Sequence, residues 1–399
     1  GKSLAYGLQH VLTMYGGIIA PPLIIGTAAG LEPAQIGLLI AAALFVGGLA
    51  TILQTVGVKY IGAKLPLVQG VSFAGVATMI AIVTAGGGLS AVYGAVIVAS
   101  LIGFFLAPYF SKIIRFFPPI VTGCVITVIG LSLLPVAVRW MMGGNSKAPD
   151  WGSAENISLA FLTLAIVIVL NITRNATIRR LSILLAIVLG TVLAYAMGFG
   201  DFSKVANGNW IQFPSFFAFG MPTFELSAII AMLIVTLVIM TETTADIIAV
   251  GEIVGTKVDA ERITNGLRAD MLSSAAAPIF GSFMQSAFAQ NVGLVAITGV
   301  KSRFVVAGSG VILMLLGLFP KMAALVACIP APVLGGAGIA MFGMVAANGI
   351  RVLAKVEYEG EGNYNVLIVG ISLAMGLLSM AVPEIFKHLT GIWSIIFHS

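Results

Sequence analysis

The sequence has little charge for its length. Only 9% of its 399 residues are Asp, Glu, Lys or Arg, whereas 59% are hydrophobic and the mean hydropathy is +1.09. A soluble globular domain does not need so much apolar surface, which excludes an ordinary soluble enzyme or binding module. The composition predicts an all-α polytopic membrane protein whose surroundings are the lipid bilayer.

Cysteine and histidine are also scarce. Cys124 and Cys328 stand alone in apolar runs, so we expect reduced thiols and no disulfide framework. The three histidines lack metal-ligand spacing and no His-Glu-x-x-His occurs, so we expect neither a metal nor a cofactor. The net charge of +5 is scattered over short loops, which argues against nucleic acid as a partner. A serine enzyme would need a histidine facing a serine, and His10 is the one candidate, so we do not expect an enzyme.

Apolar runs predict fourteen membrane segments, several of them too short or too rich in glycine to span alone. The first is expected to be a true span and not a cleaved signal sequence. The segments cover about 4–26, 34–55, 65–84, 89–110, 118–136, 157–172, 180–198, 225–250, 264–280, 283–299, 303–319, 322–346, 365–381 and 384–397.

Lysine and arginine sort to one side of these segments. Fourteen of the 20 follow even-numbered segments and Lys2 makes fifteen, whereas five lie in the odd-numbered connections. By the positive-inside rule, both termini are predicted to be cytoplasmic in a multi-pass protein of the cell membrane.

The two halves of the sequence resemble each other. Pro118-Pro119 and the residues around it match the stretch that holds Pro330 and Pro332, and Gln69-Gly-Val-Ser-Phe73 matches Gln285-Ser-Ala-Phe288. Seven segments per half is an odd number, so the second half must be inserted upside down. Two inverted repeats with broken segments are typical of a secondary transporter. We expect a short strand in each broken segment, 65–84 and 283–299, with the two facing each other near the midplane.

Polar side chains in these apolar runs are the candidate site residues. Gln290 and Asn291 are adjacent amides within a broken segment, where each unpartnered group would cost about 1 to 3 kcal/mol. Glu242 and Asp246 are four residues apart and so share one helix face. Asp270 lies early in the ninth segment. Carboxylates at membrane depth are expensive and mark substrate or proton pathways by default, although helix capping and support of the broken backbone are the structural alternatives.

The motif Gln290-Asn291-x-Gly293-x-x-x-x-Thr298-Gly299 resembles the signature of the nucleobase-ascorbate transporter family, in its branch of bacterial xanthine and uric acid permeases. The match continues through Lys301-Ser-Arg303 and into 332–336. This resemblance implies a seven-plus-seven inverted fold and a homodimer. It also implies a core domain, from 1–112 and 225–320, that moves like an elevator against a gate domain, from 113–224 and 321–399.

The resemblance implies a proton-coupled importer of a purine, xanthine or urate. Which carboxylate carries the proton stays open, because a partly desolvated carboxyl group at any of the three positions could load a proton outside and release it inside. The implied substrate-binding residues are Glu242, Gln290, Phe73, Ser72 and Ala289, and the implied proton-coupling or supporting residues are Asp270, Asp246, His10 and Asn291.

The sequence leaves more than one purine and more than one class of transporter open. Ser72 resembles the urate-handling members and Asp246 the xanthine-selective ones, so the evidence is split. Met284-Gln285-Ser286 and Ala245 depart from common residues of the branch and put the pocket width in doubt. Uracil or ascorbate uptake is the alternative within the family, although ascorbate members typically have Pro where Gln290 stands. An anion exchanger of the same architecture could use two helix N-termini, but central carboxylates would repel a small anion.

Overall fold

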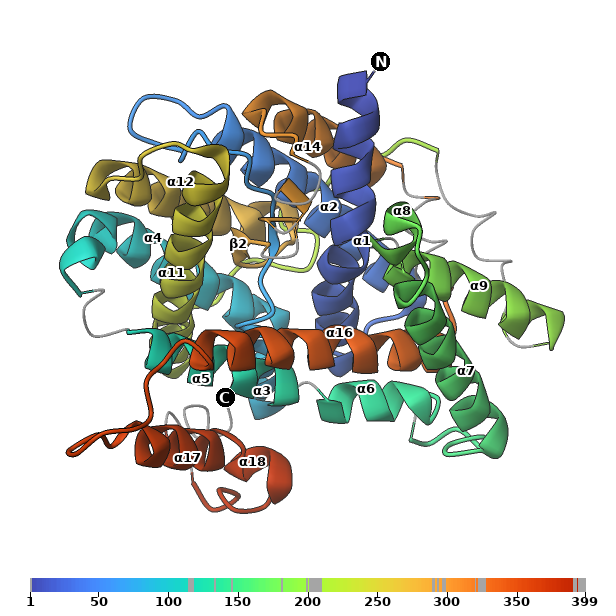
Figure 1. Ribbon diagram of the computed structural model, residues 1–399. Coiled ribbons are helices and arrows are strands. Elements are labelled where there is room, and N and C mark those ends of the chain that lie inside the picture. Colours follow the sequence, from blue (N-terminus) through green and yellow to red (C-terminus); the bar gives the residue numbers. More distant parts are fainter. Residues whose placement is uncertain are drawn as a thin grey trace. The chain divides into compact units, whose positions relative to one another are not determined.

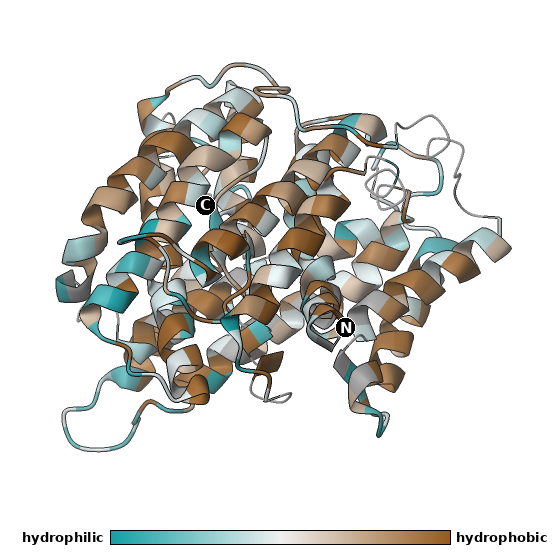
Figure 2. Cartoon of the chain, turned by 90° about the horizontal axis from the view of Figure 1, so that it is seen from above, coloured by the Kyte–Doolittle hydropathy of each residue, from teal (hydrophilic) through white to brown (hydrophobic). Residues whose placement is uncertain are grey.

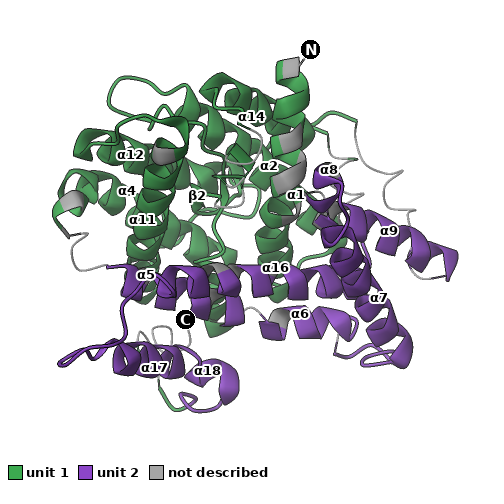
Figure 3. Ribbon diagram, viewed as in Figure 1, with its two compact units in different colours: residues 1–116, 208–327, 388–399 green, residues 117–207, 328–387 purple. Residues whose placement is uncertain are grey.

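The computed structural model describes residues 2–113, 118–132, 134–144, 146–180, 182–198, 200, 210–288, 291–292, 294–295, 299–319, 321, 328–389 and 393. It is mostly helical, and the chain forms two compact units, residues 1–116, 208–327 and 388–399, and residues 117–207 and 328–387 (Figure 3). The expected division into a core domain that moves against a gate domain stays a prediction.

The first unit holds the two broken segments (Figure 1). Its elements are α1 (Lys2–Ala28), α2 (Pro33–Thr55), β1 (Gln69–Val71), α3 (Val76–Ile82), the π-helix η1 (Val83–Gly87), α4 (Gly88–Ile113), α11 (Leu226–Val254), α12 (Ala260–Phe280), β2 (Gln285–Ala287) and α14 (Arg303–Gly317).

The second unit is built around one long helix, α16, which packs against α5, α6, α7 and α9. Helix α16 approaches α5 and α7 closely at glycines. A Cβ added at Gly130 of α5 would lie 2.4 Å from Ala346 N, and one added at Gly336 of α16 would lie 2.2 Å from Ala160 O. The second unit comprises the following elements: α5 (Pro119–Ser132), α6 (Leu134–Met141), α7 (Ala154–Asn171), α8 (Ala176–Arg180), α9 (Ser182–Ala196), α16 (Ala331–Leu353), α17 (Asn365–Gly376) and α18 (Leu378–Ala381).

Several helices are membrane spans. Within the described residues, six are long and apolar enough to cross a bilayer: Pro33–Thr55, Val76–Phe110, Pro119–Met141, Ala154–Asn171, Leu226–Gly251 and Ala331–Leu353. Figure 2 shows that apolar residues predominate along the helices. The count of fourteen stays a prediction, because residues 383–388 form turns and half of the last predicted segment, 384–397, lies outside the described residues.

Local sequence sets where the helices begin and end. Pro33 opens α2 behind a capping box, in which Glu32 accepts from the backbone and Gln35 accepts from the Glu32 N–H at 3.1 Å. The Asp259 side chain caps α12 by accepting from Arg262 N at 2.9 Å. Helix α12 ends at Gly281, whose φ of 88° suits a residue without a Cβ. The turn that follows leads directly into β2.

The two broken segments meet as a two-stranded antiparallel sheet. The register pairs Gln69 with Ala287, Gly70 with Ser286 and Val71 with Gln285. Irregular backbone at membrane depth needs hydrogen-bond partners from within the protein, and here each strand supplies the other's. Strands therefore lie in the third and tenth predicted segments, 65–84 and 283–299.

The stretch 210–224 belongs to the first unit, although the sequence-based boundary lies at residue 224. Phe217 N donates to Ile279 O at 2.9 Å and Thr223 N donates to Ser90 O at 3.0 Å. These backbone contacts fasten the stretch to the C-terminal end of α12 and the start of α4.

Candidate functional site

Hydroxyl groups from neighbouring helices satisfy the outer edges of the strand pair. In an antiparallel pair, alternate N–H groups point away from the partner strand. Gln69 N donates to Thr51 Oγ1 at 3.0 Å, and Gln285 N donates to Ser274 Oγ at 2.8 Å. Ala287 N donates to Thr243 Oγ1 at 3.4 Å. Three hydroxyls thus take the place of neighbouring strands and fix β1 and β2 against α2, α12 and α11.

Asp270 lies at the centre of a buried polar cluster. Its side chain is 1% exposed, and its Oδ2 accepts a hydrogen bond from the Thr243 hydroxyl. The Gln69 amide lies against its Oδ1. With the amide nitrogen toward Asp270, Gln69 also donates to Ser286 O at 3.2 Å and accepts from Gln54 Nε2 at 3.1 Å. The carboxylate of α12 is therefore joined to α11 and to both strands.

Gln54 ties this cluster to the loop that leads into β1. Its Nε2 donates to Gly266 O at 3.1 Å and lies 3.5 Å from Asp270 Oδ1. Its Oε1 accepts from Ala63 N at 2.8 Å. A buried amide with partners on both ends holds α2, α12 and the loop in one arrangement.

Glu242 and Asp246 lie next to the cluster on α11, and both side chains are half-buried. Asp246 is within electrostatic range of Glu242 and Asp270, and Asp270 is within range of Glu242. The structure therefore brings together the three carboxylates singled out in the sequence. Among the described residues, none of the three has a lysine or arginine salt-bridge partner, so no fixed positive charge neutralises the group.

Ser72 and Phe73 stand where β1 turns into α3. Ser72 N donates to Met284 O at 2.9 Å, and Ala74 N donates to Ser72 Oγ at 3.2 Å. Phe73 is half-buried, and its carbonyl accepts from Val76 N at 3.2 Å. The serine hydroxyl thus closes the turn, and the phenylalanine occupies the junction between strand and helix.

Asn291 joins the second broken segment to the first helix. Its Nδ2 donates to His10 O at 3.0 Å and lies 3.2 Å from His10 Nδ1, with both residues buried. The supporting role expected of both residues stays a prediction. Ala289 and Gln290 lie outside the described residues, so the expected clamp of Glu242 with Gln290 stays a prediction.

Sequence reasoning missed several members of the cluster. Gln54, Thr51 and Ser274 were not singled out, and Gln69 and Gln285 were noted only as a repeat. Thr243 stands beside Glu242, but threonine in a membrane helix ordinarily bonds to its own helix, so its identity carried no signal. Glutamines inside apolar segments were the available signal, because a buried amide needs partners.

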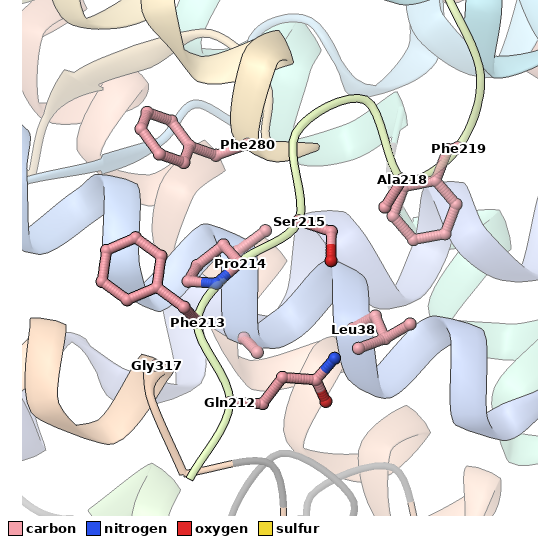
Figure 4. Close-up of a pocket in the computed structure, with 11 residues that line it drawn as sticks. Leu38, Gln212, Phe213, Pro214, Ser215, Ala218, Phe219, Phe280 and Gly317 are labelled. Carbon is pink, nitrogen blue, oxygen red and sulfur yellow. The ribbon is translucent and has the colours of Figure 1, made fainter.

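A hollow in the same unit is lined by none of these carboxylates (Figure 4). Its volume of about 50 Å³ has room for little more than water, whereas small-molecule pockets occupy about 300 to 1,000 Å³. No charged residue lines it, so it is not the candidate site. The lining residues include Leu38, Gln212, Phe213, Phe219, Phe280 and Gly317.

Comparison with known proteins identifies the family. The sequence pattern of a permease family matches residues 1–385. The chain is 43% identical to uric acid permease PucK of Bacillus subtilis (98% of this chain, 90% of the relative) and 42% identical to a xanthine permease of the same organism (98% and 88%). It is 40% identical to uric acid transporter UacT of Escherichia coli, covering 100% of this chain and 83% of the relative.

Solved structures show the same fold at low sequence identity. The transmembrane domain of the cyanobacterial bicarbonate transporter BicA matches with a TM-score of 0.69 and 17% identity, over 99% of this chain and 97% of that one. The murine anion transporter Slc26a9 in its inward-facing state matches with a TM-score of 0.61 and 13% identity, over 99% and 66%. With its signature, its apolar helices and these relatives, the chain belongs to the permease family of nucleobase-ascorbate transporters and is a multi-pass membrane protein.

Proposed function

We propose that this protein is a proton-coupled symporter that imports a purine nucleobase, xanthine or urate, across the cell membrane. The observation that carries this proposal is the contact of α11 with the strand pair at Thr243, the residue next to Glu242. The next residue, Thr243, binds both Ala287 of β2 and Asp270. The names of the relatives, which are uric acid and xanthine permeases, supply the substrate class.

Glu242 is the proposed acceptor for the purine. A carboxylate can take two hydrogen bonds from the N–H groups along one edge of a purine. Gln290, which follows β2 by three residues, would pair with the base through its amide, and the Phe73 ring would stack on the heterocycle. The backbone at Phe73 and Ala289 would frame the base, while His10 and Asn291 support the strand-helix junction.

Coupling to protons is proposed from the group of three carboxylates. Glu242, Asp246 and Asp270 carry like charges within electrostatic range of one another, and repulsion between them is relieved when one takes up a proton. Proton uptake at Asp270 would therefore relieve this repulsion and leave Glu242 ionised as the acceptor for the purine. The elevator movement, the homodimer and the cytoplasmic placement of both termini belong to the same proposal.

The test is uptake by purified protein in proteoliposomes with an imposed inward proton gradient. Labelled xanthine and labelled urate are each offered, with unlabelled urate, xanthine, uracil, guanine and ascorbate as competitors. We expect accumulation that collapses with a protonophore. The ranking of competitors decides between xanthine and urate, the choice on which Ser72 and Asp246 pointed in opposite directions.

Two glutamate variants, one in α11 and one directly before it, test the proposed acceptor. Glu242→Gln should lower purine uptake at least about tenfold, because the variant loses a charge-assisted acceptor. Glu225→Gln, at the exposed N-terminal approach to α11, should transport like the wild type. Wild-type uptake by the Glu242 variant would reject the assigned acceptor. If no purine enters or competes, the purine proposal falls, and bicarbonate exchange by this fold becomes the experiment to run.

A further inference from the structure

The threonines of α11 do not all make the same hydrogen bond. Three donate to the carbonyl four residues earlier: Thr236 to Met232 O at 2.8 Å, Thr241 to Leu237 O at 2.9 Å, and Thr244 to Met240 O at 2.7 Å. This is the ordinary choice for threonine in an apolar helix. The fourth, Thr243, is fully buried and gives its hydrogen to the Asp270 carboxylate instead.

Thr243 also accepts a hydrogen bond from the second strand. Its Oγ1 takes the Ala287 N–H at 3.4 Å while it donates to Asp270 Oδ2. One oxygen thus stands between the carboxylate of α12 and the strand that leads to the proposed substrate position. When Asp270 is ionised, its carboxylate can only accept, so the Thr243 hydroxyl is then the donor.

We propose that Thr243 is a positioning residue that transmits the protonation of Asp270 to β2, an inference that rests on the proposed proton-coupled purine transport. A proton from the outer solution forms one O–H bond on Asp270 and neutralises the carboxylate. The Thr243 hydroxyl then donates to a neutral carboxyl group, and the charge-assisted hydrogen bond between the two becomes weaker. Release of the proton restores the charge and the stronger hydrogen bond, and no other covalent bond forms or breaks.

The change of charge alters what the strand meets. While Asp270 is ionised, its charge polarises the Thr243 hydroxyl and strengthens Thr243 Oγ1 as the acceptor of the Ala287 N–H. A neutral carboxyl group removes this polarisation, so the contact of α11 with β2 depends on the proton.

The charged groups around this contact are few. Glu242 and Asp246 face Asp270 from α11. The guanidinium groups of Arg262 and Arg268 donate to the carbonyls of Ala63 and Tyr60 at 3.1 and 3.4 Å. Helix α2 and both strands carry no charged residue.

The test separates coupling from transport itself. Proteoliposomes are assayed for xanthine accumulation driven by a proton gradient, and for exchange of labelled against unlabelled xanthine at equal pH, in which the protein need not release its proton. Thr243→Val keeps the side-chain shape and removes the hydroxyl. We expect accumulation to fall about tenfold while exchange stays within about twofold, since the lost bond is made to a charged group.

Controls keep the result specific. Thr244→Val, which removes a hydroxyl bonded only within its helix, should change neither assay, and Thr243→Ser should restore accumulation to within about twofold. If Thr243→Val does not fold, Thr243→Ala replaces it, because alanine also lacks the hydroxyl and has a smaller side chain. Equal loss in both assays, or accumulation at the wild-type level, would overturn the inference. A wild-type protein inactive in both assays would instead reject the proposed function.

Discussion

Gly70 of β1 lies directly opposite Ser286 of β2, and a matching backbone hydrogen bond between the strands lies on each side of this pair. Ser72 N donates to Met284 O at 2.9 Å, and Phe288 N donates to Val68 O at 3.0 Å. Each of these residues has its counterpart 216 positions along the chain (68 and 284, 72 and 288), as do Gly70 and Ser286. Such a symmetric register is what a twofold relation between inverted repeats requires.

The two strand glutamines are equivalent by this relation but not in their contacts. Gln69 meets Asp270, Ser286 and Gln54, whereas Gln285 Nε2 donates to Phe283 O at 2.8 Å and its buried Oε1 has no partner among the described residues. We therefore expect Gln69→Leu to lower the free energy of unfolding by about 1 to 3 kcal/mol, because Asp270 Oδ1 loses its nearest donor and keeps only Gln54 Nε2 at 3.5 Å. Gln285→Leu should cost less. Thermal unfolding of the two variants in detergent makes the comparison, and an equal or larger loss in Gln285→Leu would contradict it.

Asp270→Asn should separate folding from coupling. The amide can still accept from Thr243, and it can donate to Gln69 once the Gln69 amide turns its oxygen toward position 270, so we expect stability within about 2 kcal/mol of the wild type. It cannot carry the proton, so accumulation against a gradient should be lost, together with proton entry followed by a pH-sensitive dye. Asp259→Asn is the matched control on the same helix, because asparagine caps a helix as well as aspartate does. Full accumulation by Asp270→Asn would assign the proton to another carboxylate.

Helices α2 and α14 meet through glycines. A Cβ added at Gly310 would lie 2.8 Å from Gly48 O, whereas a Cβ added at Gly308 would meet nothing within 4 Å. Gly310→Ala should therefore destabilise the protein by about 1 to 3 kcal/mol through overpacking, whereas Gly308→Ala should be neutral or slightly stabilising. The midpoint of thermal unfolding measures both variants. A neutral Gly310→Ala would show that the two helices separate at little cost.

The predicted orientation can be tested with single cysteines. After replacement of Cys124 and Cys328 by alanine, Lys59→Cys and Lys147→Cys place thiols at exposed positions on the two predicted sides. The positive-inside rule predicts that an impermeant maleimide labels position 147 in intact cells and position 59 only after permeabilisation. The reverse pattern would invert the assigned topology.

Much of the architecture could be read from local sequence. The apolar runs predicted the spans, because burial in lipid requires about 20 consecutive apolar residues whatever the neighbouring helices are. The match of Gln69 and the residues after it to Gln285 and its neighbours predicted two broken segments that face each other, and the strands formed there. The spacing of Glu242 and Asp246 placed both on one face of α11, because helix periodicity depends only on residue number.

Other features required the tertiary structure. Four threonines of α11 are alike in sequence, yet only Thr243 lies where Asp270, 27 positions later, can accept its hydrogen. Gln54 reaches the same cluster from 216 positions before Asp270. Hydropathy, charge and spacing are properties of neighbouring residues and determined the spans and the candidate carboxylates. The partner of each buried hydroxyl or amide depends on which helices pack together, and only the folded chain decided it.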